Sequence, residues 1–138
     1  MSYTIVFVPF LALISAQIIK VIIDAIQGKF SWRDFNHYGG MPSSHAAMVA
    51  ALATETGTLF GFNTAVFAIS LAFAFLIIRD AIGLRQELGY HSKILNMLIK
   101  DLPDYKEEKY PFLEERLGHT YLQAFIGMIL GIIIALII

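Results

Sequence analysis

The residues best suited to chemistry stand at positions 39–45, where the sequence reads GGMPSSH and a long apolar stretch follows. Glycines free the backbone there, and Pro42 suits the first turn of a helix. A helix start exposes unpaired N–H groups and the positive end of the helix dipole, so it attracts anions such as phosphate. Ser43, Ser44 and His45 add two hydroxyls and an imidazole at this point. The run therefore predicts an anion site.

A second histidine stands at an equivalent place later in the chain. The residues LGHT at 117–120 precede another apolar stretch. Gln123 follows His119 by four residues, which puts both side chains on one helical face. Imidazole can act as a nucleophile or a proton donor near neutral pH, because its unperturbed pKa is about 6.5. Two helix starts that each carry an imidazole would thus face one phosphate.

Charged residues inside and beside the apolar stretches add to this site. Lys20 lies about two turns inside the first stretch, on a face shared with Gln17 and Asp24. A charge within a membrane is costly, so a partner or a function is expected for Lys20. Arg85 and Asp80 follow the third stretch. Simple pairing of Lys20 with Asp24, and of Arg85 with Asp80, is the alternative interpretation.

Composition assigns the chain to the membrane. It has 138 residues, 57% of them hydrophobic, and a mean hydropathy of +0.67, which is too apolar for an ordinary soluble domain. The absence of cysteine excludes disulfides and thiolate metal sites. Nothing in the charge pattern suggests a nucleic-acid surface. We expect one domain over residues 1–138, embedded in the lipid bilayer.

Four spans follow from the roughly 20 residues that a bilayer core requires. They cover residues 3–26, the two halves of 46–78, and residues 121–138, with the middle stretch broken near Gly57, Gly61 and Asn63. An amphipathic piece at 94–99 is expected along the membrane interface. The predicted fold is all-α: a polytopic membrane helical bundle of about four transmembrane helices plus an interfacial segment.

Basic residues predict the orientation of this bundle. Of the ten Lys and Arg residues, all but Lys20 fall on the side where the first and third spans end and the second and fourth begin. The positive-inside rule places that side in the cytoplasm. Both histidine-bearing helix starts lie there too, so the site is expected on the cytoplasmic face of the cell membrane.

The motifs resemble those of a known superfamily. Residues 42–45 (PSSH) are similar to the second signature, usually Pro-Ser-Gly-His, of the type 2 phosphatidic acid phosphatases and vanadium-dependent haloperoxidases. Residues 39–47, 80–85 (DAIGLR) and 117–120 followed by Gln123 look still more like its divergent branch of small membrane proteins. The resemblance extends over nearly the whole chain, from Ala16 to Gly127.

The resemblance implies a mechanism. In the superfamily one histidine attacks phosphorus to give a phosphohistidine, a second protonates the departing alkoxide, and cations, serines and amides hold the phosphoryl oxygens. Positioning and charge stabilisation are what phosphoryl transfer requires, so no metal and no cofactor are expected. By this likeness His119 is the nucleophile, His45 the general acid and Gln123 the residue that orients His119. The implied phosphate site comprises Lys20, Ser43, Ser44, Asp80 and Arg85.

Two departures from the superfamily pattern bear on these roles. An acid usually stands four residues after the nucleophile, where this chain has Gln123, which stabilises an imidazolium less. Glu114, Glu115 or Asp80 could supply that charge. The usual arginine-to-histidine spacing of six residues fits Arg85 and His91, so His91 is the alternative nucleophile. We prefer His119, because it opens a span and has a polar partner at i+4.

The sequence therefore predicts a metal-independent phosphatase that hydrolyses a lipid or polyprenyl phosphate monoester. Two alternatives are a lipid-phosphate-binding transporter or flippase component that does not hydrolyse its ligand, and a catalytically dead membrane scaffold. The small-residue pairs Gly57/Gly61 and Gly127/Gly131 signal close helix packing. This packing is either within the bundle or between subunits of a homo-oligomer.

Overall fold

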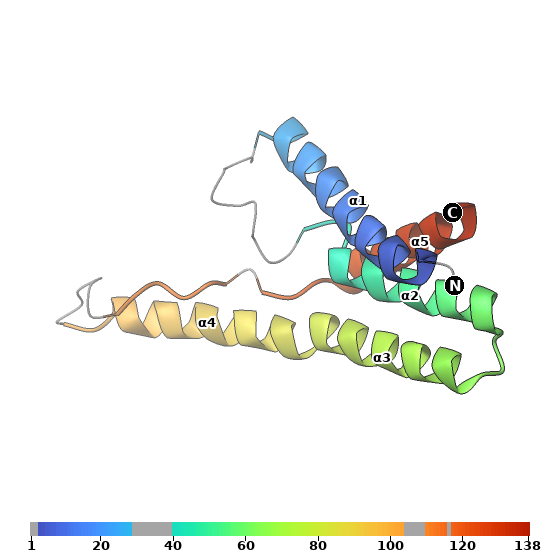
Figure 1. The fold of residues 1–138 in the computed structure, drawn as a ribbon. Helices are drawn as coiled ribbons and strands as arrows, with labels where there is room; N and C mark the ends of the chain where they lie inside the picture. The colour runs from blue at the N-terminus through green and yellow to red at the C-terminus, as the bar shows by residue number, and fades with distance from the viewer. Residues whose placement is uncertain (1–2, 29–39, 104–109, 116) are drawn as a thin grey trace.

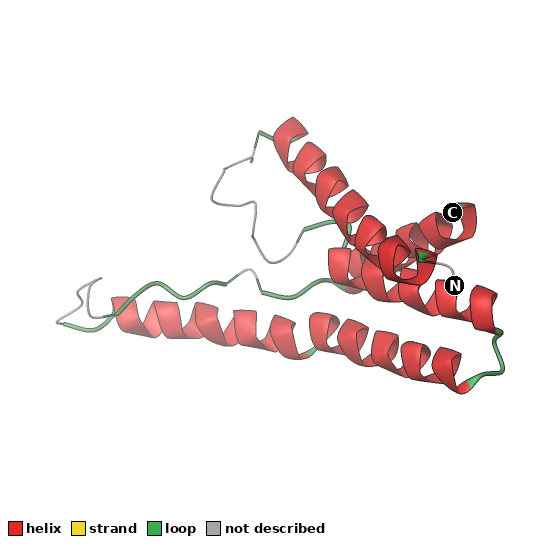
Figure 2. Ribbon diagram, viewed as in Figure 1, coloured by secondary structure: helices red, strands yellow, loops and turns green. Residues whose placement is uncertain are grey.

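The computed structural model describes residues 3–28, 40–103, 110–115 and 117–138, and these form five helices (Figure 1). They are α1 (Thr4–Ile26), α2 (Ser44–Phe60), α3 (Ala65–Ile82), α4 (Leu84–Lys100) and α5 (Tyr121–Ile137). Helices and loops account for all of the described residues (Figure 2). The predicted all-α fold is confirmed, and the hairpin break falls at Gly61, whose N–H caps α2. Gly39, the first residue of the predicted anion-binding run, lies outside the described residues.

The helices run in alternating directions, as predicted. α1 and α3 end where α2 and α5 begin, and both chain termini lie at the opposite end (Figure 1). Helix α2 is central and contacts α1, α3 and α5. The residues with predicted chemistry thus share one end of the bundle: Lys20, residues 40–45, the pair Asp80 and Arg85, and residues 117–123.

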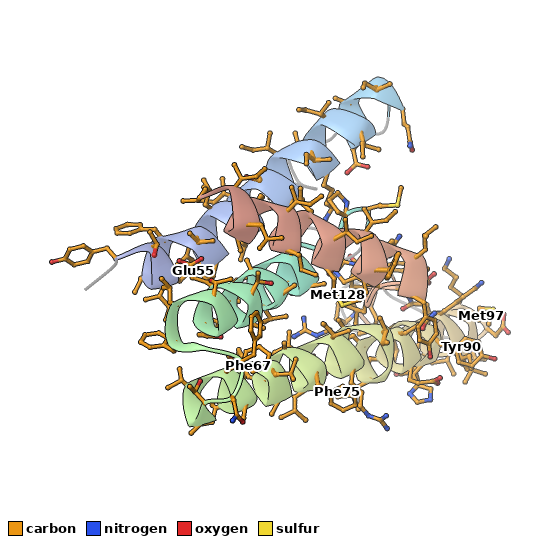
Figure 3. All side chains as sticks on the ribbon, turned by 90° about the vertical axis from the view of Figure 1, so that its right-hand side faces the viewer. Glu55, Phe67, Phe75, Tyr90, Met97 and Met128 are labelled. Carbon is orange, nitrogen blue, oxygen red and sulfur yellow. The ribbon has the colours of Figure 1, made fainter. Side chains whose placement is uncertain are left out.

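Small residues build the core, and large apolar residues face outward. One cluster joins Val8, Ala12 and Ala16 of α1 to Ala47, Ala51 and Ala135, and another joins Val49 and Ala53 of α2 to Ala74 of α3. Phe75, in contrast, is 64% exposed and points away from the bundle (Figure 3). Small residues allow helix backbones to approach, and large apolar side chains on the outside suit a lipid environment. The structure is therefore a helical membrane bundle.

Length and hydropathy support this assignment among the described residues. α1 is long and apolar enough to cross a membrane, as is the Ala65–Lys100 rod of 36 residues that α3 and α4 form together. α5 is apolar but has 17 residues.

Glycines of α5 let this helix lie directly against the backbone of α2. A Cβ atom at Gly127 would collide with the carbonyl oxygen of Ser43, and one at Gly131 with that of Ala47. Gly57 packs in a similar way against the Phe62 ring, within the same chain. Gly127, Gly131 and Gly57 thus serve close packing inside the chain, whereas Gly61 makes no close contact and instead ends α2 with φ +95°.

Helix α4 continues from α3 after a break at Gly83. The N–H of Gly83 donates to the Arg79 carbonyl at 2.9 Å and closes α3. α4 then extends beyond the other helices, nearly in line with α3 (Figure 1). The amphipathic piece predicted at 94–99 is part of this longer helix. Residues 110–115 and 117–120 return along α4 to the start of α5 (Figure 1).

A larger residue at Gly131 should destabilise the bundle. We expect Gly131→Leu to lower the free energy of unfolding by about 1–3 kcal/mol or more, because its side chain would overlap the Ala47 backbone. Thermal unfolding in detergent measures this loss. Ala72→Leu, a matched change at an exposed position of α3, should unfold near the wild-type temperature. Equal stability of the two variants would contradict the packing described.

Candidate functional site

The starts of α2 and α5 are joined by a direct hydrogen bond. The Ser43 N–H donates to the Gln123 carbonyl at 3.1 Å. Each helix also has its own N-cap: the Ser43 hydroxyl accepts the Ala46 N–H at 3.4 Å, and the Thr120 hydroxyl accepts the Gln123 N–H at 3.3 Å. Two positive helix ends therefore lie together, as the sequence predicted.

Ser43 rather than Pro42 begins this arrangement. Pro42 is buried and precedes the N-cap, so its predicted place in the first helical turn is wrong. Ser43 is fully buried, and its carbonyl accepts the first main-chain bond of the α2 ladder, from Ala47. The N–H groups of Ser44 and His45 come before that first bond. Such groups at a helix start point toward an anion when one is bound.

His119 is held against the junction of α3 and α4. Its N–H donates to the Ala81 carbonyl at 2.9 Å. The preceding Gly118 has φ +85°, and a Cβ atom there would lie 2.6 Å from the Gln86 nitrogen. Only glycine adopts this backbone easily at so close an approach. The peptide that carries His119 is thus pressed onto the first turn of α4.

Lys20 lies in the site, at 7% exposure. Its side chain packs on Gly40, where an added Cβ would be 2.8 Å from the lysine Cε. The Lys20 charge acts on both His45 and His119. Gly40 thus leaves the space that the buried lysine stem occupies beside the two rings.

Arg85 and Asp80 form an ion pair across the break between α3 and α4. The Arg85 Nε lies 2.7 Å from Asp80 Oδ2, and the two side chains are 38% and 32% exposed. Both charges act on His45. The structural pairing considered as an alternative is therefore present. In the described part of the chain this pairing is made through the Arg85 Nε, and the terminal nitrogens of the guanidinium have no partner there, so they can bind an anion.

Burial lowers the pKa of His119 below its ordinary value, and the positive charges of His45 and Lys20 lower it further, while nearby polar groups of Gln123 and Gly40 oppose the change. The imidazole of His119 is therefore neutral at neutral pH. Its Nδ1 is buried and has no hydrogen-bond partner of good geometry among the described residues. A buried polar atom without a protein partner is uncommon and is typical of reactive sites.

Gln123 completes the cap of α5. Its side-chain oxygen accepts the Thr120 N–H at 2.9 Å, which with the Thr120 hydroxyl forms a capping box. The role of orienting His119 through an accepted hydrogen bond stays a prediction. Of the acids considered in its place, Asp80 acts on His45 and Glu115 accepts from Asn96.

The structure brings together most of the predicted residues and separates one. Lys20, Asp80 and Arg85 act on His45, and Lys20 and His45 act on His119. His91 is exposed on α4, with its ring 6.5 Å from that of Tyr90. It is not among the groups whose charges reach either site histidine. The geometry thus favours His119 over His91.

Sequence reasoning missed the contact that positions His119 from a distance. Asn96 is 4% exposed and donates to the Leu113 carbonyl at 2.9 Å and to Glu115 Oε1 at 2.8 Å. Its own oxygen accepts the Leu113 N–H at 3.0 Å. Gly89, seven residues earlier and on the same side of α4, lets the Glu115 and Leu117 backbone approach. The available signal was this Gly–Asn pair at helical spacing.

Comparison with known proteins shows the family of this chain and a similar curated protein. The family model described as the divergent PAP2 family matches residues 1–134. An uncharacterized membrane protein of Bacillus subtilis (strain 168), YuiD, is 37% identical over 139 aligned positions, covering 92% of this chain and 88% of YuiD. No solved structure matches the chain.

Removing the Asn96 amide should loosen the segment that carries His119. We expect Asn96→Ala to cost about 1–3 kcal/mol of stability, since the Leu113 N–H and carbonyl lose their partner. Hydrogen exchange of peptides covering residues 111–119 should become faster, and unfolding in detergent should occur earlier. Gln86→Ala removes an exposed amide from the same helix and is the control. Unchanged exchange in Asn96→Ala would refute the positioning role.

Proposed function

We propose, from the premise that the chain belongs to the divergent PAP2 family, that it is a membrane phosphatase acting on a lipid or polyprenyl phosphate monoester. The observation that carries the proposal is the pair of helix starts joined by Ser43 and Gln123, each with a histidine beside it. An anion is the natural ligand of such a pair, and phosphate is the anion that lipids present at this depth.

Binding uses the cations and the amides. Lys20 and the terminal nitrogens of Arg85 contact the phosphoryl oxygens, with the N–H groups of Ser44 and His45. Ser43 is the N-cap of α2, and its hydroxyl donates a hydrogen bond to a phosphoryl oxygen. Asp80 orients the Arg85 guanidinium through their ion pair. Fixed charges of this kind stabilise the negative charge of the transition state more than water does.

Hydrolysis then takes two steps. Neutral His119 attacks phosphorus, the bond to the alcohol oxygen breaks with its electron pair on that oxygen, and His45 delivers a proton to it. Water next attacks the phosphohistidine and gives its proton to His45, which releases inorganic phosphate and restores both rings. The lowered pKa of His119 supports this role, because the attacking ring must be unprotonated. Gln123 orients the ring of His119 by accepting a hydrogen bond from the imidazole.

The proposed enzyme crosses the membrane several times, with its site on the cytoplasmic face. The alternating helix directions and the basic residues at the site end support this orientation.

Substituting the two site histidines tests the function. His119→Ala and His45→Ala should each reduce phosphate release from phosphatidate, phosphatidylglycerol phosphate or polyprenyl phosphate by about 10²-fold or more. His91→Ala should keep near wild-type activity and is the matched control. Vanadate, which resembles five-coordinate phosphorus, should inhibit the wild type.

Several outcomes would overturn the proposal. No release from any of these substrates by the purified wild type would remove the enzyme assignment. Phosphate-lipid binding by both the wild type and His119→Ala, with turnover by neither, would favour a transporter component. Absence of both binding and turnover would favour a catalytically dead scaffold, the alternative that draws on Gln123 in place of the usual acid. Loss of activity in His91→Ala alone would reassign the nucleophile.

Cysteine labelling tests the orientation, because the chain has no native cysteine. Met97→Cys, exposed on α4, should react with an impermeant maleimide only after the membrane is opened. Phe62→Cys, exposed in the turn at the opposite end, should react in intact cells. The reverse pattern would place the site outside.

A further inference from the structure

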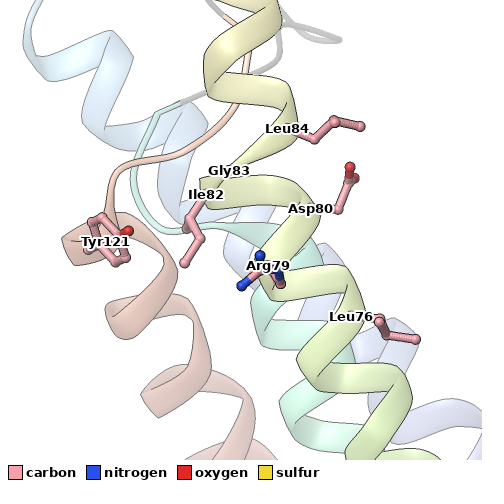
Figure 4. Close-up of a pocket in the computed structure, with 7 residues that line it drawn as sticks. All are labelled: Leu76, Arg79, Asp80, Ile82, Gly83, Leu84 and Tyr121. Carbon is pink, nitrogen blue, oxygen red and sulfur yellow. The ribbon is translucent and has the colours of Figure 1, made fainter.

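An open pocket of about 510 Å³ adjoins the candidate site, between the junction of α3 and α4 and the start of α5 (Figure 4). Its polar lining consists of Arg79, Asp80 and Tyr121. Leu76 and Leu84 add apolar surface to its lining. This combination suits a ligand with one anionic group and an attached hydrocarbon chain.

The pocket and the phosphate site share a wall. Asp80 lines the pocket and also holds Arg85 at 2.7 Å. The next residue, Ala81, accepts the His119 N–H at 2.9 Å, and Tyr121 follows His119 by two residues. A substrate with its reacting phosphate at His119 therefore has its remaining part beside this pocket.

Arg79 is a cation that the phosphate site does not use. The charges that act on His45 come from Lys20, Asp80 and Arg85, and those that act on His119 come from Lys20 and His45, so Arg79 is not among them. Arg79 is exposed and has no ion pair or hydrogen bond through its side chain among the described residues. Its guanidinium instead lies in the pocket, between α3 and α5 (Figure 4).

The geometry points to a second phosphate-binding position, formed by Arg79 and the Tyr121 hydroxyl, which holds a phosphate in the leaving group of the substrate. The inference rests on the proposed function and narrows its substrate class to lipids with two neighbouring phosphates. The terminal phosphoryl group is transferred to His119, from a phosphoanhydride in a diphosphate or from a monoester in phosphatidylglycerol phosphate. The second group is either the other phosphate of the diphosphate, bonded directly to the leaving oxygen, or a phosphodiester separated from that oxygen by the glycerol carbons, and the hydrocarbon passes Leu76 and Leu84. Arg85 and Arg79 thus serve two separate anions.

The test compares substrate selectivity in the purified full-length protein. Phosphate release is measured from phosphatidate, which has one phosphate, and from a polyprenyl diphosphate and phosphatidylglycerol phosphate, which have two. We expect the wild type to have the higher kcat/KM on one of the two-phosphate substrates, and this identifies the source of the second phosphate. Arg79→Gln should reduce the ratio of kcat/KM on that substrate to kcat/KM on phosphatidate by roughly tenfold, mainly through KM. Arg79→Lys should restore part of it.

Controls separate this inference from simpler roles of Arg79. Lys93→Gln, which removes an exposed charge of α4 outside the pocket, should leave the ratio unchanged. Arg85→Gln should reduce turnover of all three substrates. A uniform effect of Arg79→Gln on all three would show that Arg79 only binds bulk lipid head groups or complements the end of α3, and it would overturn the inference. A wild-type preference for phosphatidate would do the same.

Failure of the proposed function itself gives a different result, namely no release from any substrate. Calorimetric binding then decides the inference, with methylenediphosphonate and methylphosphonate as probes. Weaker binding of the diphosphonate alone in Arg79→Gln supports the second position. An equal change for both probes, or none, rejects it.

Discussion

The contact between the backbones of α2 and α5 is the constraint on which the site depends. Gly127 and Gly131 permit it, and the Ser43–Gln123 hydrogen bond completes it. Its electrostatic consequence is unfavourable without a ligand, because two positive helix ends meet near Lys20. Among the described residues, Asp80 is the acid whose charge acts on His45. The packing of the bundle therefore favours binding of an anion where the starts of α2 and α5 meet.

A second group of contacts positions the imidazole of His119. His119 belongs to the segment that returns along α4, residues 110–115 and 117–120. This segment contacts the Asn96 side chain, Gly89 and the Ala81 carbonyl. Most of these contacts use main-chain groups of the segment, and the Glu115 carboxylate adds a side-chain bond to Asn96. Helix α4 is thus a rigid support that places an imidazole beside a helix start from which it is distant in sequence.

Much of the fold and the main site residues could be predicted from the sequence, because hydropathy, charge and helix-start chemistry are local signals. These signals placed α1 and α5 within a residue or two and put His45 and His119 at helix starts. They did not reveal the capping use of Gln123, the clamp at Asn96 or the setting of Arg79. Those features depend on contacts between distant segments. Pro42 was predicted in the first turn of the helix but lies just before it, because Ser43 is the better N-cap residue and α2 begins after it.

The anchoring of the return segment has a consequence for how such chains can vary in length. Leu113 is tied to Asn96, and Gly118 abuts the first turn of α4, so the four positions between these anchors set a fixed chain length. One inserted residue there would rotate the imidazole out of reach. Relatives should therefore keep the number of residues between these anchors, and α4 can lengthen between Gly89 and Asn96 only by whole turns, with a matching extension of the returning segment.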